Sequence, residues 1–149
     1  MNINLVNYKL YSDTYIIYEI KGKGKEYNVY NDKLIYEGEF INGLKNGKGK
    51  EYNNDGKLVY EGEYLKGIKN GIGREYNDEC ILVFEGKYLN GERNGKGKKY
   101  YFGKLLFDGQ YKNGKRWNGK GEKFYFFDQL RFEGVFIDGK IWNGIGYNI

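Results

Sequence analysis

The stretch Leu58–Tyr76, LVYEGEYLKGIKNGIGREY, decides the fold of this chain because its order of residue types recurs along the sequence. It contains an aromatic–acid–Gly–acid–aromatic segment, then a turn with one glycine, then a segment with two glycines two residues apart. Related segments begin at Ile35, Val83, Leu106 and Phe132. Self-similarity at a regular interval indicates a repeat protein.

The repeats leave little of the chain for anything else. The central glycine of the first segment falls at Gly38, Gly62, Gly86, Gly109 and Gly134, so the intervals are 24, 24, 23 and 25 residues. We therefore expect one repeat domain over residues 1–149: an N-terminal β cap (1–21), a partial repeat (22–33) and five repeats of 23–25 residues (34–149), the last truncated. The cap contains candidate strands Ile3–Tyr11 and Tyr15–Ile20 without the glycine pattern, and terminal repeats commonly depart from consensus in this way.

Each half of a repeat alternates with a period of two, which is typical of a β-strand. The turn residues between the halves predict a β-hairpin, and Asp55-Gly56 predicts a turn between hairpins. The predicted fold class is therefore all-β, a single-layer elongated antiparallel sheet of consecutive β-hairpin repeats. With Gly67-Ile68 as the turn, Tyr64 faces Gly71 and Glu61 faces Arg74.

This register separates two faces. Aromatic rings lie over glycines on one face, where no Cβ blocks close approach, and acids face bases on the other. Opposite charges also meet at Glu37–Lys50 and Glu85–Lys98. Since a single layer has no second sheet to cover its aromatic face, we expect part of every ring to remain accessible.

The composition argues against catalysis. The chain has no His and one Cys, so it lacks an imidazole base, a His metal ligand, a thiolate cluster and an intramolecular disulfide. We predict no catalytic residues, no metal and no cofactor. The paired carboxylates Glu37–Glu39 and Glu61–Glu63 could suggest glycosidase chemistry, but their recurrence beside lysines favours a charge ladder.

The chain shows no signal peptide and no apolar stretch of the length that a membrane span needs. We expect a cytoplasmic protein, with a peripheral position at a membrane or the cytoskeleton as an alternative. Net charge is +5, but acids and bases are interleaved, which argues against nucleic acid as a partner.

The unit YEGEYLKGIKNGIGREY resembles a MORN (membrane occupation and recognition nexus) repeat, in which Tyr-Glu-Gly-x-aromatic is followed by Gly and Gly-x-Gly. The resemblance covers about Leu34 to Tyr147, with a half unit at Gly22–Tyr27. It implies a scaffold that binds partners and sometimes attaches to membranes or cytoskeleton. The family more often has Trp at the second aromatic position, whereas this chain has Phe40, Tyr64, Tyr88, Tyr111 and Phe136. The spacing also resembles a bacterial antitoxin-like branch of MORN variants.

Specificity is expected where the repeats differ. Gly43 and Gly47 are four residues apart, but Gly114–Gly119 and Gly139–Gly144 are five apart, and the longer turns carry the only tryptophans, Trp117 and Trp142. Either the longer turn needs a ring for packing, or the pair is a contact hot spot for a partner. The candidate partner-binding residues are Trp117, Trp142, Tyr64, Tyr88, Tyr111 and Phe136.

A second candidate surface is the aromatic run Phe124, Tyr125, Phe126 and Phe127. It is either strand core that caps the last hairpin or an oligomer interface that joins two chains through the C-terminal edge.

The sequence therefore favours a non-catalytic interaction module that presents an aromatic face and a tryptophan rim to another protein. A peripheral membrane adaptor that binds lipid and an antitoxin or immunity-like protein that binds a toxin are the alternatives. The basic residues are too dispersed among acids to give the lipid alternative strong support.

Overall fold

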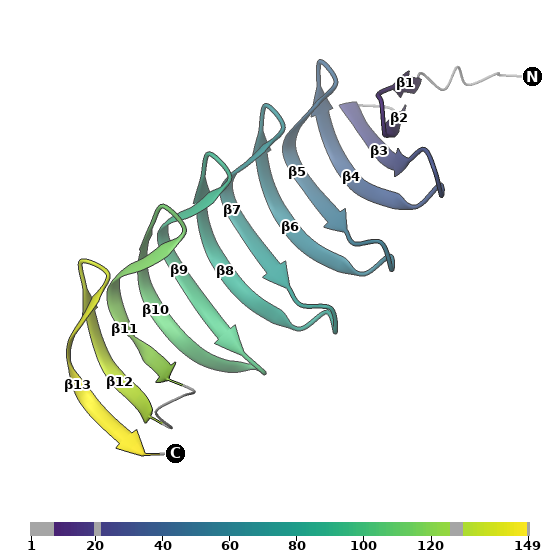
Figure 1. Cartoon of the computed structure of the whole chain (residues 1–149). Helices are drawn as coiled ribbons and strands as arrows, with labels where there is room; N and C mark the ends of the chain where they lie inside the picture. The colour runs from purple at the N-terminus through teal and green to yellow at the C-terminus, as the bar shows by residue number, and fades with distance from the viewer. Residues whose placement is uncertain (1–7, 20–21, 126–129, 149) are drawn as a thin grey trace, which may run out of the picture.

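The computed structural model describes residues 8–19, 22–125 and 130–148 and confirms the predicted all-β fold. The described residues form one antiparallel sheet of 13 strands in which each strand pairs with its neighbours in sequence (Figure 1). The strands are β1 (Tyr8–Leu10), β2 (Thr14–Tyr18), β3 (Lys23–Asn28), β4 (Leu34–Ile41), β5 (Leu44–Tyr52), β6 (Leu58–Leu65), β7 (Ile68–Tyr76), β8 (Leu82–Leu89), β9 (Glu92–Tyr101), β10 (Lys104–Lys112), β11 (Lys115–Tyr125), β12 (Leu130–Ile137) and β13 (Lys140–Asn148).

At the N-terminal end, the two predicted cap strands correspond to β1 and β2, which are shorter than expected within the described residues. β2 pairs along its whole length with β3, the partial repeat, and β3 pairs in turn with β4. The sheet therefore continues from these first strands into the repeats.

The predicted charge register is confirmed, but the predicted hairpin turn is wrong. Glu61 lies opposite Arg74 as expected, whereas Tyr64 lies opposite Lys69 rather than Gly71. The turn is Lys66-Gly67, with φ of 51° and 87°, and positive φ at both central residues gives the twist that suits a two-residue hairpin. Residues 70–72 lie opposite the single residue Glu63. This bulge brings the rest of the hairpin back to the predicted pairing.

The connection between hairpins is also longer than the predicted Asp55-Gly56 turn. The Asn53 amide donates to the Lys57 carbonyl at 2.9 Å. The Asn53 side-chain oxygen accepts the N–H groups of Asp55 and Lys57 at 3.0 Å each. Asn77 accepts two N–H groups in the same way in the next connection. In each of these two loops, an asparagine side chain therefore accepts backbone N–H groups and so stabilises the turn.

The predicted stacking of rings on glycines is confirmed. Tyr36 lies over Gly49, Tyr60 over Gly73 and Phe84 over Gly97, so close that an added Cβ would lie within 3 Å of the ring in each case. Neighbouring rings meet edge to face, with centroids 5.1 to 5.6 Å apart from Phe40 to Phe136. This geometry is favourable for aromatic pairs.

The expectation that part of every ring stays accessible is wrong. Tyr36 and Phe84 are fully buried and Tyr60 is 1% exposed. The strands curve along their length (Figure 1), and Tyr36 and Phe40, about 13 Å apart on a straight strand, bring their ring centroids to 5.2 Å. The aromatic face is thus the inside of a bend, and one layer folds over its own rings.

Candidate functional site

Four of the six candidate partner-binding residues lie in the core. Tyr64, Tyr88, Tyr111 and Phe136 are at most 5% exposed because each ring is packed between rings of its own hairpin and of the preceding one. Their hydrocarbon surface is therefore not on the outside of the molecule, where a partner would meet it.

The two tryptophans do not lengthen the turns, contrary to the prediction. Both turns keep two residues, because Lys112 pairs with Lys115 and Ile137 with Lys140. Trp117 is instead a single extra residue in β11, between Arg116 and Asn118, and Trp142 is the corresponding bulge in β13. A bulge directs its side chain away from the regular alternation of the strand.

The environments of the two rings differ. Trp117 is half-buried and packs against the turn of the next hairpin, where a Cβ added to Gly139 would lie 3.6 Å from the indole. The Lys112 ammonium lies 4.4 Å from the Trp117 ring centroid. Trp142 is 75% exposed. Packing therefore accounts for part of the Trp117 surface and leaves Trp142 open.

Of the aromatic run, Phe124 and Tyr125 belong to the end of β11, whose backbone pairs with β12. Phe126 and Phe127 lie outside the described residues. The prediction of an oligomer interface there stays a prediction.

The hairpin turns form a row along one edge of the sheet (Figure 1). About half-exposed aliphatic side chains flank the first two turns on both sides and the third and fifth turns on one side, whereas Lys112 and Lys115 flank the fourth turn. Successive turns contact each other, since Leu44 lies beside Gly67 and Ile68 beside Gly91. We call this edge the turn rim and define it by Ile41, Leu44, Leu65, Ile68, Leu89, Trp117, Ile137 and Trp142.

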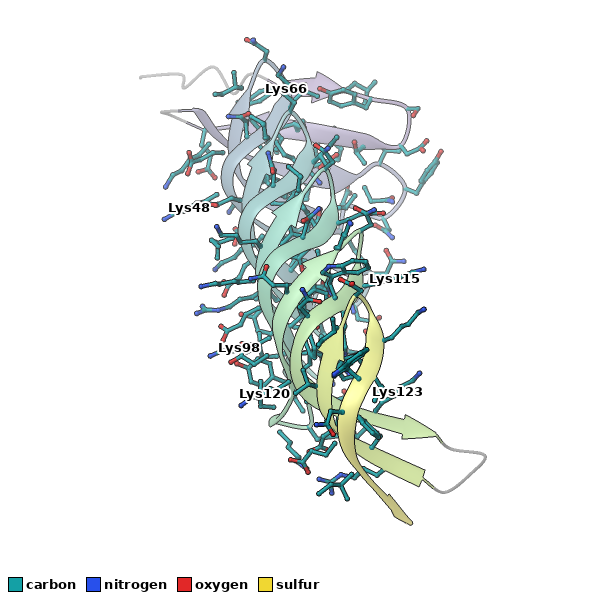
Figure 2. All side chains as sticks on the ribbon, turned by 90° about the vertical axis from the view of Figure 1, so that its left-hand side faces the viewer. Lys48, Lys66, Lys98, Lys115, Lys120 and Lys123 are labelled. Carbon is teal, nitrogen blue, oxygen red and sulfur yellow. The ribbon has the colours of Figure 1, made fainter. Side chains whose placement is uncertain are left out.

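The face opposite the rings carries a ladder of alternating charges. From β3 to β11, one paired residue per strand reads Lys25, Glu37, Lys50, Glu61, Arg74, Glu85, Lys98, Asp108 and Lys120. Figure 2 shows Lys48, Lys98 and Lys120 along one side of the ribbon and Lys115 and Lys123 along the other. A groove of about 1150 Å³ follows the ladder, with a floor that includes Gly38, Gly62 and Gly86.

Tyrosines extend the ladder. The hydroxyls of Tyr52, Tyr76 and Tyr100 donate to Glu37, Glu61 and Glu85 at 2.5, 2.6 and 2.8 Å. Partial burial and the carboxylate partner raise the pKa of each of these three tyrosines to about 12. The carboxylates are thus engaged, and the structure gives no support to the glycosidase interpretation of the Glu pairs.

A set of polar contacts that the sequence pattern did not predict covers the aromatic core. Lys69 lies 4.0 Å from the Tyr60 ring centroid, and Arg93 lies 4.3 Å from that of Phe84. Cations over rings are favourable, more so when partly desolvated. The signal in the sequence is the basic residue before the Asn-Gly of the second strand in three hairpins, Lys45-Asn46-Gly47, Lys69-Asn70-Gly71 and Arg93-Asn94-Gly95. Its role depends on the bend, which the sequence pattern does not give.

Each of these cations also meets a carboxylate. Lys69 pairs with Glu51 at 2.9 Å, and Arg93 binds Glu75, with its Nε 3.0 Å from the carboxylate. The Tyr88 hydroxyl donates to the same Glu75. Burial alone would raise the pKa of Glu75, but its bonds to Arg93 and Tyr88 outweigh burial and lower that pKa. The half-buried charges are thus paired, as their environment requires.

Among the described residues, no group of three or more His, Cys, Asp or Glu could hold a metal ion. Cys80 is exposed. The described part of the chain contains no helix long and apolar enough to cross a membrane.

Comparison with known families agrees with this architecture. The model of the MORN repeat matches residues 36–57, 60–80, 84–102 and 107–122, each of which starts at the ring that lies over a glycine. No curated protein sequence gives a significant match to the chain. The fifth hairpin, β12–β13, lies beyond the matched residues but repeats the register of the fourth. With more than half of its residues matched by the family model, this chain belongs to the MORN repeat family.

Proposed function

We propose that this chain is a non-catalytic interaction module that binds another protein through its turn rim. MORN repeats are commonly protein- or membrane-interaction modules, and the family is generally non-catalytic. The observation that carries the proposal is the row of half-exposed aliphatic side chains along the first three turns, with Ile137 and the open Trp142 at the last hairpin. Contiguous exposed apolar surface of this kind marks interaction sites.

The rim has the features of a protein-binding surface. Ile41, Leu65 and Leu89 occupy the same position before the turn in successive hairpins. A row of anchors along neighbouring hairpins forms an extended surface such as repeat proteins use for binding. Trp142 adds a large ring, and Trp is enriched among residues whose loss weakens binding most.

The binding surface proposed here is the turn rim and not the aromatic face that the sequence favoured. The rings of Tyr64, Tyr88 and Tyr111 stabilise the core, so removing these rings would unfold the sheet rather than report on binding. Among the candidates from the sequence, Trp142 has the most accessible ring and Trp117 a half-buried one.

Affinity capture from the native source tests the proposal. The wild-type chain, the variant Leu44→Ser/Ile68→Ser and the variant Trp142→Ala serve as baits, with Ile72→Ser as the matched control. Ile72 is 53% exposed but lies on the ladder face. We expect the same protein to be recovered with wild type and control and to be lost with the rim variants. Equal recovery by all four baits would refute the rim as the binding surface.

Sedimentation with vesicles separates protein binding from the membrane alternative. Anionic phosphatidylserine vesicles at low salt should leave the wild-type chain in the supernatant. Sedimentation that the Leu44→Ser/Ile68→Ser variant abolishes would assign the rim to lipid instead of protein.

A further inference from the structure

The cations and carboxylates that lie over the aromatic rings form a polar cover. One repeat position in this cover changes from acidic to basic along the sheet. The same repeat position is Glu51 in β5, Glu75 in β7 and Lys99 in β9. In the first two cases the carboxylate lies between the tyrosine of the next strand and the basic residue of the strand after it. At the third position a cation takes the place of the acid.

Glu75 shows what this position holds when it is acidic. Its carboxylate accepts the Tyr88 hydroxyl and two groups of the Arg93 guanidinium. Glu51 likewise pairs with Lys69 at 2.9 Å and Lys45 at 3.6 Å, although the buried hydroxyl of the adjacent Tyr64 has no hydrogen-bond partner. A tyrosine and a cation thus flank a carboxylate in two successive hairpins.

In the next hairpin the equivalent groups are Tyr111 and Arg116, and the carboxylate is missing. Neither Lys99 nor Arg116 forms an ion pair with a carboxylate of any described residue. The Arg116 Nη1 donates to the backbone carbonyl of Glu122 at 2.6 Å. Two cations of this cover therefore have no acidic counterpart.

Tyr111 supplies an independent observation. Its side chain is 97% buried (3% exposed), and its hydroxyl has no hydrogen-bond partner. Burial raises the pKa of Tyr111, while the nearby Arg116 and Arg93 guanidinium groups act in the opposite direction. A buried hydroxyl without a partner is costly. The Tyr64 hydroxyl is also unpartnered, but Tyr111 lies beside two guanidinium groups, and its other counterpart, Tyr88, binds an anion.

The electrostatics of Lys99 agree with an anion site. Burial and the positive charges of Arg116 and Arg93 lower the pKa of Lys99, and Glu75 only partly compensates. An anion placed among these groups would relieve the repulsion between them.

We propose that Lys99, Arg116 and the Tyr111 hydroxyl bind a carboxylate from an acidic segment of a protein partner. The chain's own Glu75, held by Arg93 and Tyr88, is the template for this choice, since a guanidinium and a hydroxyl match a carboxylate. Lys99 and Arg116 are both partly exposed, so an incoming side chain can reach them. The proposal rests on the proposed function and adds the chemistry of the partner.

The experiment titrates wild type with an acetylated, amidated octaglutamate peptide by calorimetry, with octaglutamine as the uncharged reference. Lys99→Glu supplies the missing carboxylate from within the chain, so we expect at least a tenfold loss of affinity, or about 1.4 kcal/mol. Lys96→Glu is the matched control: it makes the same charge change in the same strand, but it lies on the ladder face opposite Gln110. It should change the affinity less than threefold.

Two further variants keep the test independent of folding. Lys99→Gln removes the charge without adding an acid, and Tyr111→Phe removes only the hydroxyl; each should weaken octaglutamate binding several-fold. Circular dichroism should show that all variants keep the β-sheet signal, and Lys99→Glu should melt no lower than wild type.

Equal weakening by Lys99→Glu and Lys96→Glu would overturn the proposal, because binding would then reflect net charge alone. Competition by inorganic phosphate at a concentration where acetate has no effect would overturn the assignment to a carboxylate. If octaglutamate does not bind while rim-dependent capture of a protein persists, the site is wrong and the proposed function stands. If rim-dependent capture fails while octaglutamate binds at Lys99, the proposed function is wrong and the site remains.

Discussion

Gly49→Ala should destabilise the chain strongly, because the Tyr36 ring packs directly against this glycine. A Cβ at this position would be 2.1 Å from the Tyr36 hydroxyl oxygen and 2.3 Å from Cζ. Tyr36 cannot move away easily, since its ring is fully buried and meets Phe40 and Tyr64 edge to face at 5.2 Å each.

The magnitude follows from this geometry. Overpacking a well-packed core costs roughly 1–3 kcal/mol, and complete loss of a large ring's packing costs roughly 3–5 kcal/mol. Because the clash involves several ring atoms, we expect the free energy of unfolding to fall by about 3 kcal/mol. For a chain of this size that corresponds to a drop in Tm of about 6–12 °C.

Thermal and urea denaturation followed by circular dichroism measure the effect, with Gly56→Ala as the control. Gly56 has a φ of +75° but nothing within 4 Å of an added Cβ, so only backbone strain of about 1 kcal/mol is expected. In a Tyr36→Leu background, the cost of Gly49→Ala should fall below about 1 kcal/mol, since the partner of the clash is smaller. The reasoning is refuted if Gly49→Ala costs no more than Gly56→Ala, or if its cost is the same in both backgrounds.

Three further predictions concern polar groups. Tyr60→Phe should stabilise the chain or leave it unchanged, because the buried Tyr60 hydroxyl has no hydrogen-bond partner; urea denaturation measures this, and a loss above about 1 kcal/mol would contradict it. Glu75→Gln should cost about 2 kcal/mol because it leaves the half-buried Arg93 without its anion. Glu61→Gln on the ladder, where the partner Arg74 is exposed, is the control and should cost about 0.2–1 kcal/mol. Tyr76 has its pKa raised to about 12 in the fold, above the ordinary value of about 10. Its contribution to stability is thus present below pH 10 and is lost as the pH rises toward 12, and denaturation of Tyr76→Phe should show a shallower decline over that range than wild type does.

The strand order and the charge register could be predicted from sequence because both are local properties of the repeat. Glu61 faces Arg74 and Gly62 faces Gly73, as the spacing of residues around one turn indicates. The stacking of Tyr60 on Gly73 follows from the same register, since a glycine without Cβ is what permits a ring to lie there.

The turn and the tryptophans were placed wrongly because the spacing of the glycines does not show which residues lie in the turn and which lie in a strand bulge. The chain contains the same residues whether Lys66-Gly67 or Gly67-Ile68 forms the turn. The pairing of Leu65 with Ile68 and the positive φ of Lys66 and Gly67 identify the first as the turn. Likewise, the extra residue that carries Trp117 fits equally well into a loop or into a strand. The structure places it in β11, where the turn before it keeps its preferred two residues.

The sequence by itself determined that this protein is a row of antiparallel hairpins with rings on one face and alternating charges on the other, because strand periodicity and pairing are set by neighbouring residues. The tertiary structure decided which groups are accessible. Bending of the strands buries Tyr64, Tyr88 and Tyr111, covers the Tyr60 and Phe84 rings with cations from the following strands and leaves the turn rim open. It also brings Lys99, Tyr111 and Arg116 from three strands around one position, an arrangement that depends on curvature rather than on spacing along the chain.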